Sequence, residues 1–405
     1  MSKSSKVFVR VGSVGAVLLI VLAVVFHGTI REVYALVTYT RTFKPDVIDE
    51  NFRSLYLKYP SVAIQRSGPV YNLPEVHQAL PKTVQANGQS ISVDEWLGRT
   101  KTSGFMVIKD GKIVSEQYFR GSDKDTRHIL MSVTKSVVSL MVGVALESGL
   151  IKSLDDPVDS YAPELKRGGY AGVTVKNVLQ MSSGVRWNED YGDLNSDVVQ
   201  YIVSILLGSV DEFTAKLPKE RPQGIYNKYV SADTQVLGMV LTGATGKPLP
   251  ELLREHIWSK LGVEQDAWWL VDTTGQAAAA GGLNASLRDM GRIGLLYLNR
   301  GKTFSGQSVV SQDWIKASVT PDAPHLMPGK KPTSDWVLGY GYQWWIPQNP
   351  EDDYSAIGIF GQFVYVYPRH GVVIVKTSAY DDYFESGEKM ELESLEVFRA
   401  LAKAL

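Results

Sequence analysis

The stretch that decides the fold is His128-Ile129-Leu130-Met131-Ser132-Val133-Thr134-Lys135-Ser136-Val137-Val138. Ser132 and Lys135 stand three residues apart at the start of an apolar run, and this spacing places both side chains on one helical face. A hydroxyl beside an amine forms a nucleophile and its base, provided that burial lowers the pKa of the lysine. The apolar run continues to Leu146 and predicts a buried helix. The alternative from these residues alone is a core helix whose lysine reaches out to solvent.

The same Ser-x-x-Lys pattern occurs a second time, at Ser386 and Lys389. That copy lies in a polar, acidic stretch, where a lysine stays solvated and charged. We interpret it as a surface coincidence. The pattern alone is therefore weak evidence, and the residues around it must decide.

Composition excludes several function classes. The chain has 405 residues, 44% of them hydrophobic, and a net charge of -1, which indicates a large core and excludes a disordered or nucleic-acid-binding composition. It has no cysteine, so disulfides, thiolate metal sites and cysteine nucleophiles are excluded. The six histidines show no metal-ligand spacing, and no serine lies in a Gly-x-Ser-x-Gly elbow. We expect no metal and no organic cofactor.

The N-terminus predicts a membrane segment. Lys3, Lys6 and Arg10 precede an uncharged run over residues 11–26, and its apolar length approaches the ~20 residues that span a bilayer. No small-x-small cleavage site follows, which favours an uncleaved signal-anchor over a cleaved secretory signal. We therefore expect residues 1–29 to form a cytoplasmic tail and an anchor, with residues 7–27 in the bacterial inner membrane. The positive-inside rule then places the rest of the chain on the periplasmic side.

The remaining chain predicts one large domain, residues 96–405, behind a lead-in segment. Residues 30–95 mix prolines, apolar and polar positions without sustained periodicity, so we expect them to be extended. Apolar runs around Asp110-Gly111 predict a hairpin. Strand-like patterns return late in the chain, at residues 339–346, 362–367 and 372–375. The fold class is α/β (α+β): an antiparallel sheet from about 96–125 and 335–405, flanked by helices, with a mainly helical insertion over about 145–330.

A second informative stretch is Pro222-Gln223-Gly224-Ile225-Tyr226-Asn227-Lys228-Tyr229-Val230-Ser231, a hydroxyl-rich turn that leads into an apolar helix. Tyr229 and Ser231 lie at the start of that helix. A tyrosinate, or a proton shared between Tyr229 and Lys135, can activate the serine and later protonate the leaving group. The alternative is that Tyr229 is a core aromatic residue.

A third stretch, Ala356-Ile357-Gly358-Ile359-Phe360-Gly361-Gln362, opens a late strand. Glycines let a backbone pass close to a substrate. We expect Gly361 and Gln362 to lend an N–H group to an oxyanion, with the second donor being the N–H of Ser132 at its helix N-terminus. The alternative is an ordinary bulged strand.

In this order the three stretches resemble the penicillin-recognising serine hydrolases of the β-lactamase/penicillin-binding-protein superfamily. That group includes class C β-lactamases, D,D-peptidases, related esterases and 6-aminohexanoate-dimer hydrolases. The resemblance covers roughly residues 95–400 and follows the family's order of Ser-x-x-Lys, then Tyr-x-Asn or Tyr-x-Ser, then Lys-Thr-Gly or a degenerate equivalent. It implies a β-lactamase/transpeptidase-like fold.

The resemblance also implies roles for single residues. Ser132 would be the acylated nucleophile, Lys135 its base or proton relay, and Tyr229 the partner that passes the proton onward. Ser231 would orient Tyr229 or the substrate. Tyr191, in the loop at residues 188–193, is similar to a tyrosine that closes over the substrate amide in the aminohexanoate-hydrolase branch. The alternative for Tyr191 is a plain surface loop.

One departure from the family pattern concerns the substrate. Ile359 stands where β-lactamases and D,D-peptidases place a lysine that holds the substrate carboxylate, so turnover of penicillins or D-Ala-D-Ala termini is disfavoured. Ser231, in Tyr-x-Ser rather than Tyr-x-Asn, favours the same conclusion. We therefore expect an amidase or esterase acting on a small molecule. The alternatives are a penicillin-binding-like D,D-peptidase or a sensor that binds cell-wall fragments with little turnover. The oligomeric state stays open.

Overall fold

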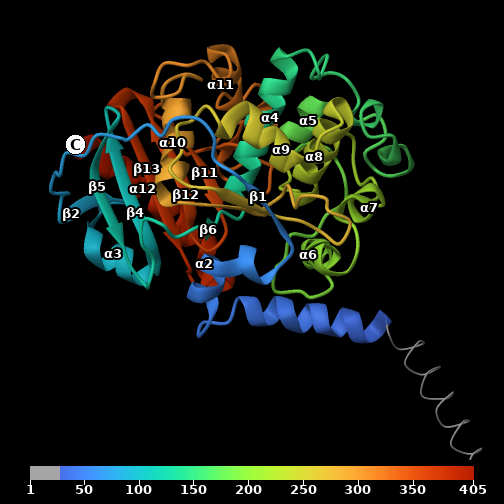
Figure 1. The fold of residues 1–405 in the computed structure, drawn as a ribbon, viewed down its shortest axis with the longest axis horizontal. Coiled ribbons are helices and arrows are strands. Elements are labelled where there is room, and N and C mark those ends of the chain that lie inside the picture. The colour runs from blue at the N-terminus through green and yellow to red at the C-terminus, as the bar shows by residue number, and fades with distance from the viewer. Residues whose placement is uncertain (1–27) are drawn as a thin grey trace, which may run out of the picture.

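The computed structural model describes residues 28–405, and its central element is a seven-stranded antiparallel sheet (Figure 1). In spatial order the strands are β5 (Lys112–Tyr118), β4 (Thr102–Lys109), β13 (Val372–Ser378), β12 (Gln362–Tyr367), β11 (Tyr354–Gly358), β10 (Trp345–Ile346) and β9 (Gly339–Tyr340). Strand β4 pairs with β13, so that Val107 faces Ile374. The prediction of a sheet assembled from the two ends of the domain is confirmed.

The predicted hairpin is confirmed as β4 and β5. Asp110 and Gly111 connect the strands with φ angles of +48° and +76°. Two left-handed residues in a two-residue turn match the twist of the flanking strands, which is why the Asp-Gly pair marks this turn.

Helices cover both faces of the sheet. Successive residues of β12 point to opposite faces, and here Phe363 contacts α12 (Tyr383–Ala404) while Val364 contacts α10 (Leu287–Leu298). Phe398 of α12 packs edge-on against Phe363, with ring centroids 5.2 Å apart. On the other face, a Cβ at Gly294 would lie 2.4 Å from a methyl carbon of Val373, so only glycine allows α10 to approach this closely.

The segment between the two parts of the sheet is mainly helical, as expected. Besides α10, its α-helices are α4 (Val133–Glu147), α5 (Val175–Leu179), α6 (Asp197–Leu207), α7 (Val210–Ala215), α8 (Ser231–Thr245), α9 (Leu249–Leu253) and α11 (Gln312–Ser318). A second, four-stranded sheet was not predicted. Its order is β1 (Ser61–Ile64), β7 (Ala267–Leu270), β8 (Leu283–Ala285) and β6 (His128–Ile129). The strands are short and come from distant segments, so no local pattern reveals their pairing.

The lead-in segment differs from the extended chain that we expected. Residues 28–42 form a helix, α2 spans Ile48–Lys58, and a hairpin of β2 (Thr83–Ala86) and β3 (Gln89–Ser92) precedes α3 (Val93–Arg99). In α2 the buried residues are Ile48, Phe52 and Leu55, a helical spacing that was overlooked. Figure 1 shows the helix at residues 28–42 beside the body, near α6, and α2 next to β6, which it contacts.

The predicted membrane anchor, residues 7–27, lies outside the described residues. Within residues 28–405, no helix is both long and apolar enough to cross a membrane.

Candidate active site

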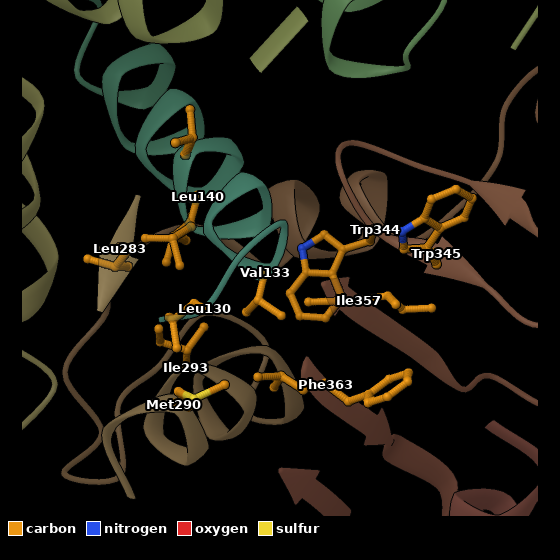
Figure 2. Close-up of a cluster of buried hydrophobic side chains, with 14 of the residues drawn as sticks. Leu130, Val133, Leu140, Leu283, Met290, Ile293, Trp344, Trp345, Ile357 and Phe363 are labelled. Carbon is orange, nitrogen blue, oxygen red and sulfur yellow. The ribbon is translucent and has the colours of Figure 1, made fainter. Parts of the chain in front are cut away.

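Ser132 is held at the N-terminal end of α4 by a strained backbone. Met131, directly before it, has a φ angle of +48°, which costs a non-glycine residue roughly 1–3 kcal/mol. Ser132 itself is the N-cap of α4 and is 8% exposed. Figure 2 shows its neighbours Leu130 and Val133 within the buried cluster, Leu130 near Ile293 of α10 and Val133 near Trp344. These anchors hold the serine at the surface of a cavity.

In the described turns and loops, the backbone N–H of Ser132 donates a hydrogen bond to no backbone carbonyl. At the first turn of a helix, such a group is available to an external acceptor.

Lys135 contacts Ser132 directly. Its Nζ atom lies 2.9 Å from Ser132 Oγ and donates a second hydrogen bond, 2.6 Å long, to the carbonyl of Ala280. The side chain is only 2% exposed, and burial lowers the pKa of Lys135 to about 8, against the opposing field of Glu189. Near neutral pH a usable fraction of this amine is therefore unprotonated.

Tyr229 completes a group of three. Its ring lies 5.2 Å from Lys135 Nζ and stacks on Trp345, with centroids 5.3 Å apart. Burial and the charge of Glu189 raise the pKa of Tyr229 well above its usual value, and a hydrogen bond with Ser132 opposes them. The phenol thus stays protonated, so of the two options left open by the sequence the tyrosinate is disfavoured.

Glu189 organises the other side of this group, and sequence reasoning missed it. Its carboxylate accepts hydrogen bonds from Ser231 Oγ at 2.6 Å, Ser231 N at 3.1 Å and Tyr191 Oη at 2.8 Å, and also from Trp187 Nε1. Ser231 thus contacts Glu189, and no contact with Tyr229 is observed for its hydroxyl. The one signal in the sequence is a carboxylate two residues before Tyr191.

The strand that passes Ser132 is β11. A Cβ at Gly358 would lie 2.6 Å from the carbonyl of Leu130 and 3.1 Å from Met131 Cβ, so glycine lets the strand approach the serine loop. Ile359 follows and lines both cavities that contain Ser132. Its N–H, like that of Ser132, donates to no backbone carbonyl in the described loops.

Gly361 and Gln362, the predicted donors, lie elsewhere. Phe360 and Gly361 have φ angles of +63° and +90°, and this tight turn carries the chain away from Ser132. Gly361 packs against Ser378, and Gln362 Nε2 donates to the carbonyl of Ser378 at 2.7 Å. Neither residue lines a cavity with Ser132, whereas Ile359 lines both.

Two cavities meet at Ser132. One, of about 130 Å³, is apolar and extends towards α6 and the N-terminal helices. The other, of about 260 Å³, is lined mainly by aromatic and aliphatic side chains and also by Glu189, Asp190, Glu388 and Glu391; we call it the polar cavity because of these four carboxyl groups. Its described lining has no lysine or arginine. Burial raises the pKa of Glu391 to about 8.

Over residues 28–405 no cluster of histidine and acidic side chains has the arrangement of a metal site.

Comparison with known proteins agrees with this geometry. Residues 97–396 match the family model described as Beta-lactamase. The chain belongs to this family. A curated relative, the 6-aminohexanoate-dimer hydrolase of Paenarthrobacter ureafaciens, is 32% identical over 338 residues, which cover 80% of this chain and 83% of the relative. This β-lactamase-family chain is therefore an enzyme, a serine hydrolase.

Solved structures support the fold. A Bacillus anthracis protein, provisionally assigned as a 6-aminohexanoate-dimer hydrolase, superposes with a TM-score of 0.77 at 23% identity, covering 88% of this chain and 96% of that protein. EstCE1, a hydrolase with promiscuous acyltransferase activity, superposes with a TM-score of 0.61 at 14% identity, covering 76% and 96%. The predicted β-lactamase-like fold is confirmed.

Proposed function

We propose that this hydrolase cleaves an amide or ester bond of a small molecule through an acyl-enzyme on Ser132. The observation that carries the proposal is the 2.9 Å contact between Ser132 Oγ and a buried Lys135 whose pKa is lowered to about 8. A buried, partly neutral lysine is a base that needs no histidine. The similarity to a 6-aminohexanoate-dimer hydrolase supports the same reaction class.

Acylation starts with proton transfer from Ser132 Oγ to neutral Lys135, while Oγ attacks the substrate carbonyl carbon. The carbonyl π-electrons move to its oxygen, and the N–H groups of Ser132 and Ile359 stabilise that oxyanion. The intermediate collapses, the bond to the leaving group breaks, and the leaving group takes a proton. Tyr229 is placed to donate this proton and to regain one from Lys135.

Deacylation repeats the sequence with water as the nucleophile. Water loses a proton to Lys135, attacks the acyl carbon, and releases the carboxylic acid as Ser132 Oγ is reprotonated. Glu189 positions Ser231 and Tyr191 at the edge of the polar cavity. We assign to Tyr191 a contact with the scissile group, as the resemblance implies.

The lining of the polar cavity supports uncharged or cationic leaving groups. Its described lining has the carboxylates of Glu189, Asp190 and Glu388 beside Glu391, whose pKa is raised to about 8, and it has no lysine or arginine; Ile359 offers no charge. A substrate carboxylate would meet like charges here, which disfavours penicillins and D-Ala-D-Ala peptides.

The decisive experiment is labelling with a fluorophosphonate probe. The intact protein should gain the mass of one phosphonyl group, located on Ser132, and Ser132→Ala should gain none. Ser386→Ala is the matched control, because it removes the serine of the other Ser-x-x-Lys pattern, where Lys389 is exposed. Labelling that persists in Ser132→Ala contradicts the proposal. A stable label from ordinary acylating agents, without turnover, would instead favour the penicillin-binding-like sensor.

We also propose that residues 7–27 anchor the enzyme in the bacterial inner membrane, with the catalytic domain on the periplasmic side. The helix at residues 28–42 supports this, because Ile30, Val33, Tyr34 and Val37 are 52–70% exposed and follow a helical spacing that suits a bilayer surface. The mass of the protein recovered from membranes tests the proposal. A mature protein that lacks residues 1–27 and is found only in the soluble fraction would contradict it and indicate a cleaved signal.

A further inference from the structure

The apolar cavity beside Ser132 has walls from parts of the chain that lie far apart. Helix α6 contributes Val198, Ile202, Ile205 and Leu206, which recur at the spacing of one helical face. The opposite wall comes from the N-terminal segment, through Tyr39 and Phe43 and through Leu55 of α2. Ser132 and Lys135 also line the cavity.

The N-terminal wall lies outside the region that matches the family model. Residues 28–58 precede the part that matches the family model, which begins at residue 97. Phe43 stacks on Phe360 with centroids 4.9 Å apart, and Phe52 packs edge-on against the same ring at 5.3 Å. The turn that carries Ile359 is therefore held by the same helices that close the cavity.

The hydroxyl groups of the walls have partners within the protein. Tyr39 Oη donates to the carbonyl of Tyr191 at 2.8 Å, Tyr201 Oη donates to Gln235 Oε1 at 2.7 Å, and the hydroxyls of Thr42 and Tyr59 bond each other at 2.8 Å. Lys135 is the one charged side chain in the described lining. A polar or charged substituent buried here would lose its hydration without gaining a partner, whereas each buried methylene gains ~0.8 kcal/mol.

We propose that this cavity binds the acyl half of the substrate, and that the preferred substrates are esters or amides of unbranched, uncharged aliphatic acids of medium length. This inference rests on the acyl-enzyme function proposed above. The carbonyl carbon would lie at Ser132 Oγ, the chain would run between α6 and the N-terminal helices, and the leaving group would occupy the polar cavity.

A chain-length series of p-nitrophenyl esters, from acetate to dodecanoate, tests the proposal on the full-length protein. We expect kcat/KM to rise about three- to fourfold per methylene, the equivalent of ~0.8 kcal/mol, and to fall once the chain exceeds the cavity. Hexanoyl and 6-aminohexanoyl p-nitroanilides form a second pair, which share a six-carbon acyl chain and differ in the terminal ammonium group. The hexanoyl substrate should be preferred at least tenfold, because the ammonium finds no carboxylate among the residues that line this cavity.

Two substitutions at Ile205 assign the effect to the cavity. Ile205→Trp fills it and should shift the optimum to shorter chains, and Ile205→Ala widens it and should reduce the gain per methylene. Leu194→Trp is the matched control, since Leu194 is 39% exposed and does not line the cavity. Its chain-length profile should match that of the wild type.

The failures of the two proposals are distinguishable. If Ser132 takes the fluorophosphonate label but kcat/KM is flat across the series, or Ile205→Trp lowers all esters equally, the acyl-chain proposal is wrong and the acyl-enzyme stands. A preference for the 6-aminohexanoyl substrate overturns it in the same way. If no ester turns over and Ser132 takes no label, the proposed function itself fails.

Discussion

Lys135, Tyr229 and Glu189 together set where protons are held around Ser132. Lys135 is buried and has a lowered pKa, and Tyr229 is held in its protonated form by burial and by Glu189. Glu189 raises the pKa values of both groups. This one carboxylate therefore limits how far burial lowers the pKa of Lys135, and it helps to keep the Tyr229 phenol protonated. The division of labour follows: Lys135 accepts a proton and Tyr229 donates one.

The pH dependence of turnover should report Lys135. With a pKa of about 8, the neutral amine increases about tenfold per pH unit below that value and levels off above it. We expect kcat/KM for a neutral ester to follow this curve between pH 6 and pH 9.5, after subtraction of uncatalysed hydrolysis. A profile that is flat over this range would show that Lys135 is not the base.

Glu189→Gln should separate the charge of this residue from its shape. Because Glu189 raises the pKa of Lys135, its removal should move the acidic limb of the profile to lower pH. Loss of charge-assisted hydrogen bonds to Ser231 and Tyr191 should also lower kcat/KM at pH 9 about tenfold, equivalent to ~1.4 kcal/mol.

Asp190→Asn is the control for Glu189→Gln. Asp190 accepts a hydrogen bond from the N–H of Gly192 at 2.8 Å within the same loop, and the shift in the pKa of Lys135 comes from burial and Glu189, not from Asp190. The midpoint of the acidic limb should stay in place for this variant. Equal shifts in both variants would mean that loop charge in general, and not Glu189, sets the pKa of Lys135.

Among the elements, α4 depends on one close contact with α11. A Cβ at Gly143 would lie 2.4 Å from the indole of Trp314, so Gly143→Ala should destabilise the protein by ~1–3 kcal/mol through overpacking. Gly98→Ala in α3 is the matched control, because its Cβ would meet nothing within 4 Å, and it should stabilise by ~0.5–1 kcal/mol. Urea unfolding of both variants measures the difference. A stabilised Gly143→Ala would show that Trp314 moves aside freely.

Elements with local signals were predictable, and contacts between distant segments were not. The hairpin at Asp110-Gly111 and the contact of Ser132 with Lys135 both depend on spacing within a few residues. Glu189 meets Ser231 across 42 residues, and nothing in its own loop indicates that contact. Gly361 and Gln362 do not line a cavity with Ser132, because the positive φ of Phe360 turns the chain directly after Ile359.

At the scale of the whole molecule, the site draws on every part of the described chain. Phe360 contacts the N-terminal segment through Phe43 and Phe52, and the C-terminal helix α12 through Tyr383 and Phe384. Glu391 of α12 lines the polar cavity, and the carbonyl of Ala280 holds Lys135. The lead-in segment, the insertion and the C-terminal helix therefore all contribute contacts around Ser132.

The buried carboxyl of Glu391 links stability to the pH at which the enzyme works. It accepts a hydrogen bond from Tyr383 Oη at 2.6 Å, and burial raises its pKa from 4.5 to about 8. A raised carboxyl pKa means that the folded state binds more protons than the unfolded state. Its contribution to stability is therefore complete below pH 4.5 and is lost as the pH rises towards 8. Lys135 becomes neutral over the upper part of the same pH range. Catalytic activity should therefore rise over the pH range in which the contribution of Glu391 to stability is lost.

Glu391→Gln should remove that pH dependence. A glutamine keeps the acceptor for Tyr383 and does not titrate, so the variant should match the wild type at pH 4.5 and exceed its stability at pH 9 by on the order of a few kcal/mol. Glu385→Gln, an exposed position on α12, is the control and should show no such trend. Thermal unfolding from pH 4.5 to pH 9 measures all three proteins. If the difference between Glu391→Gln and the wild type does not grow with pH, Glu391 is ionised in the folded protein, and the polar cavity then carries its full negative charge at neutral pH.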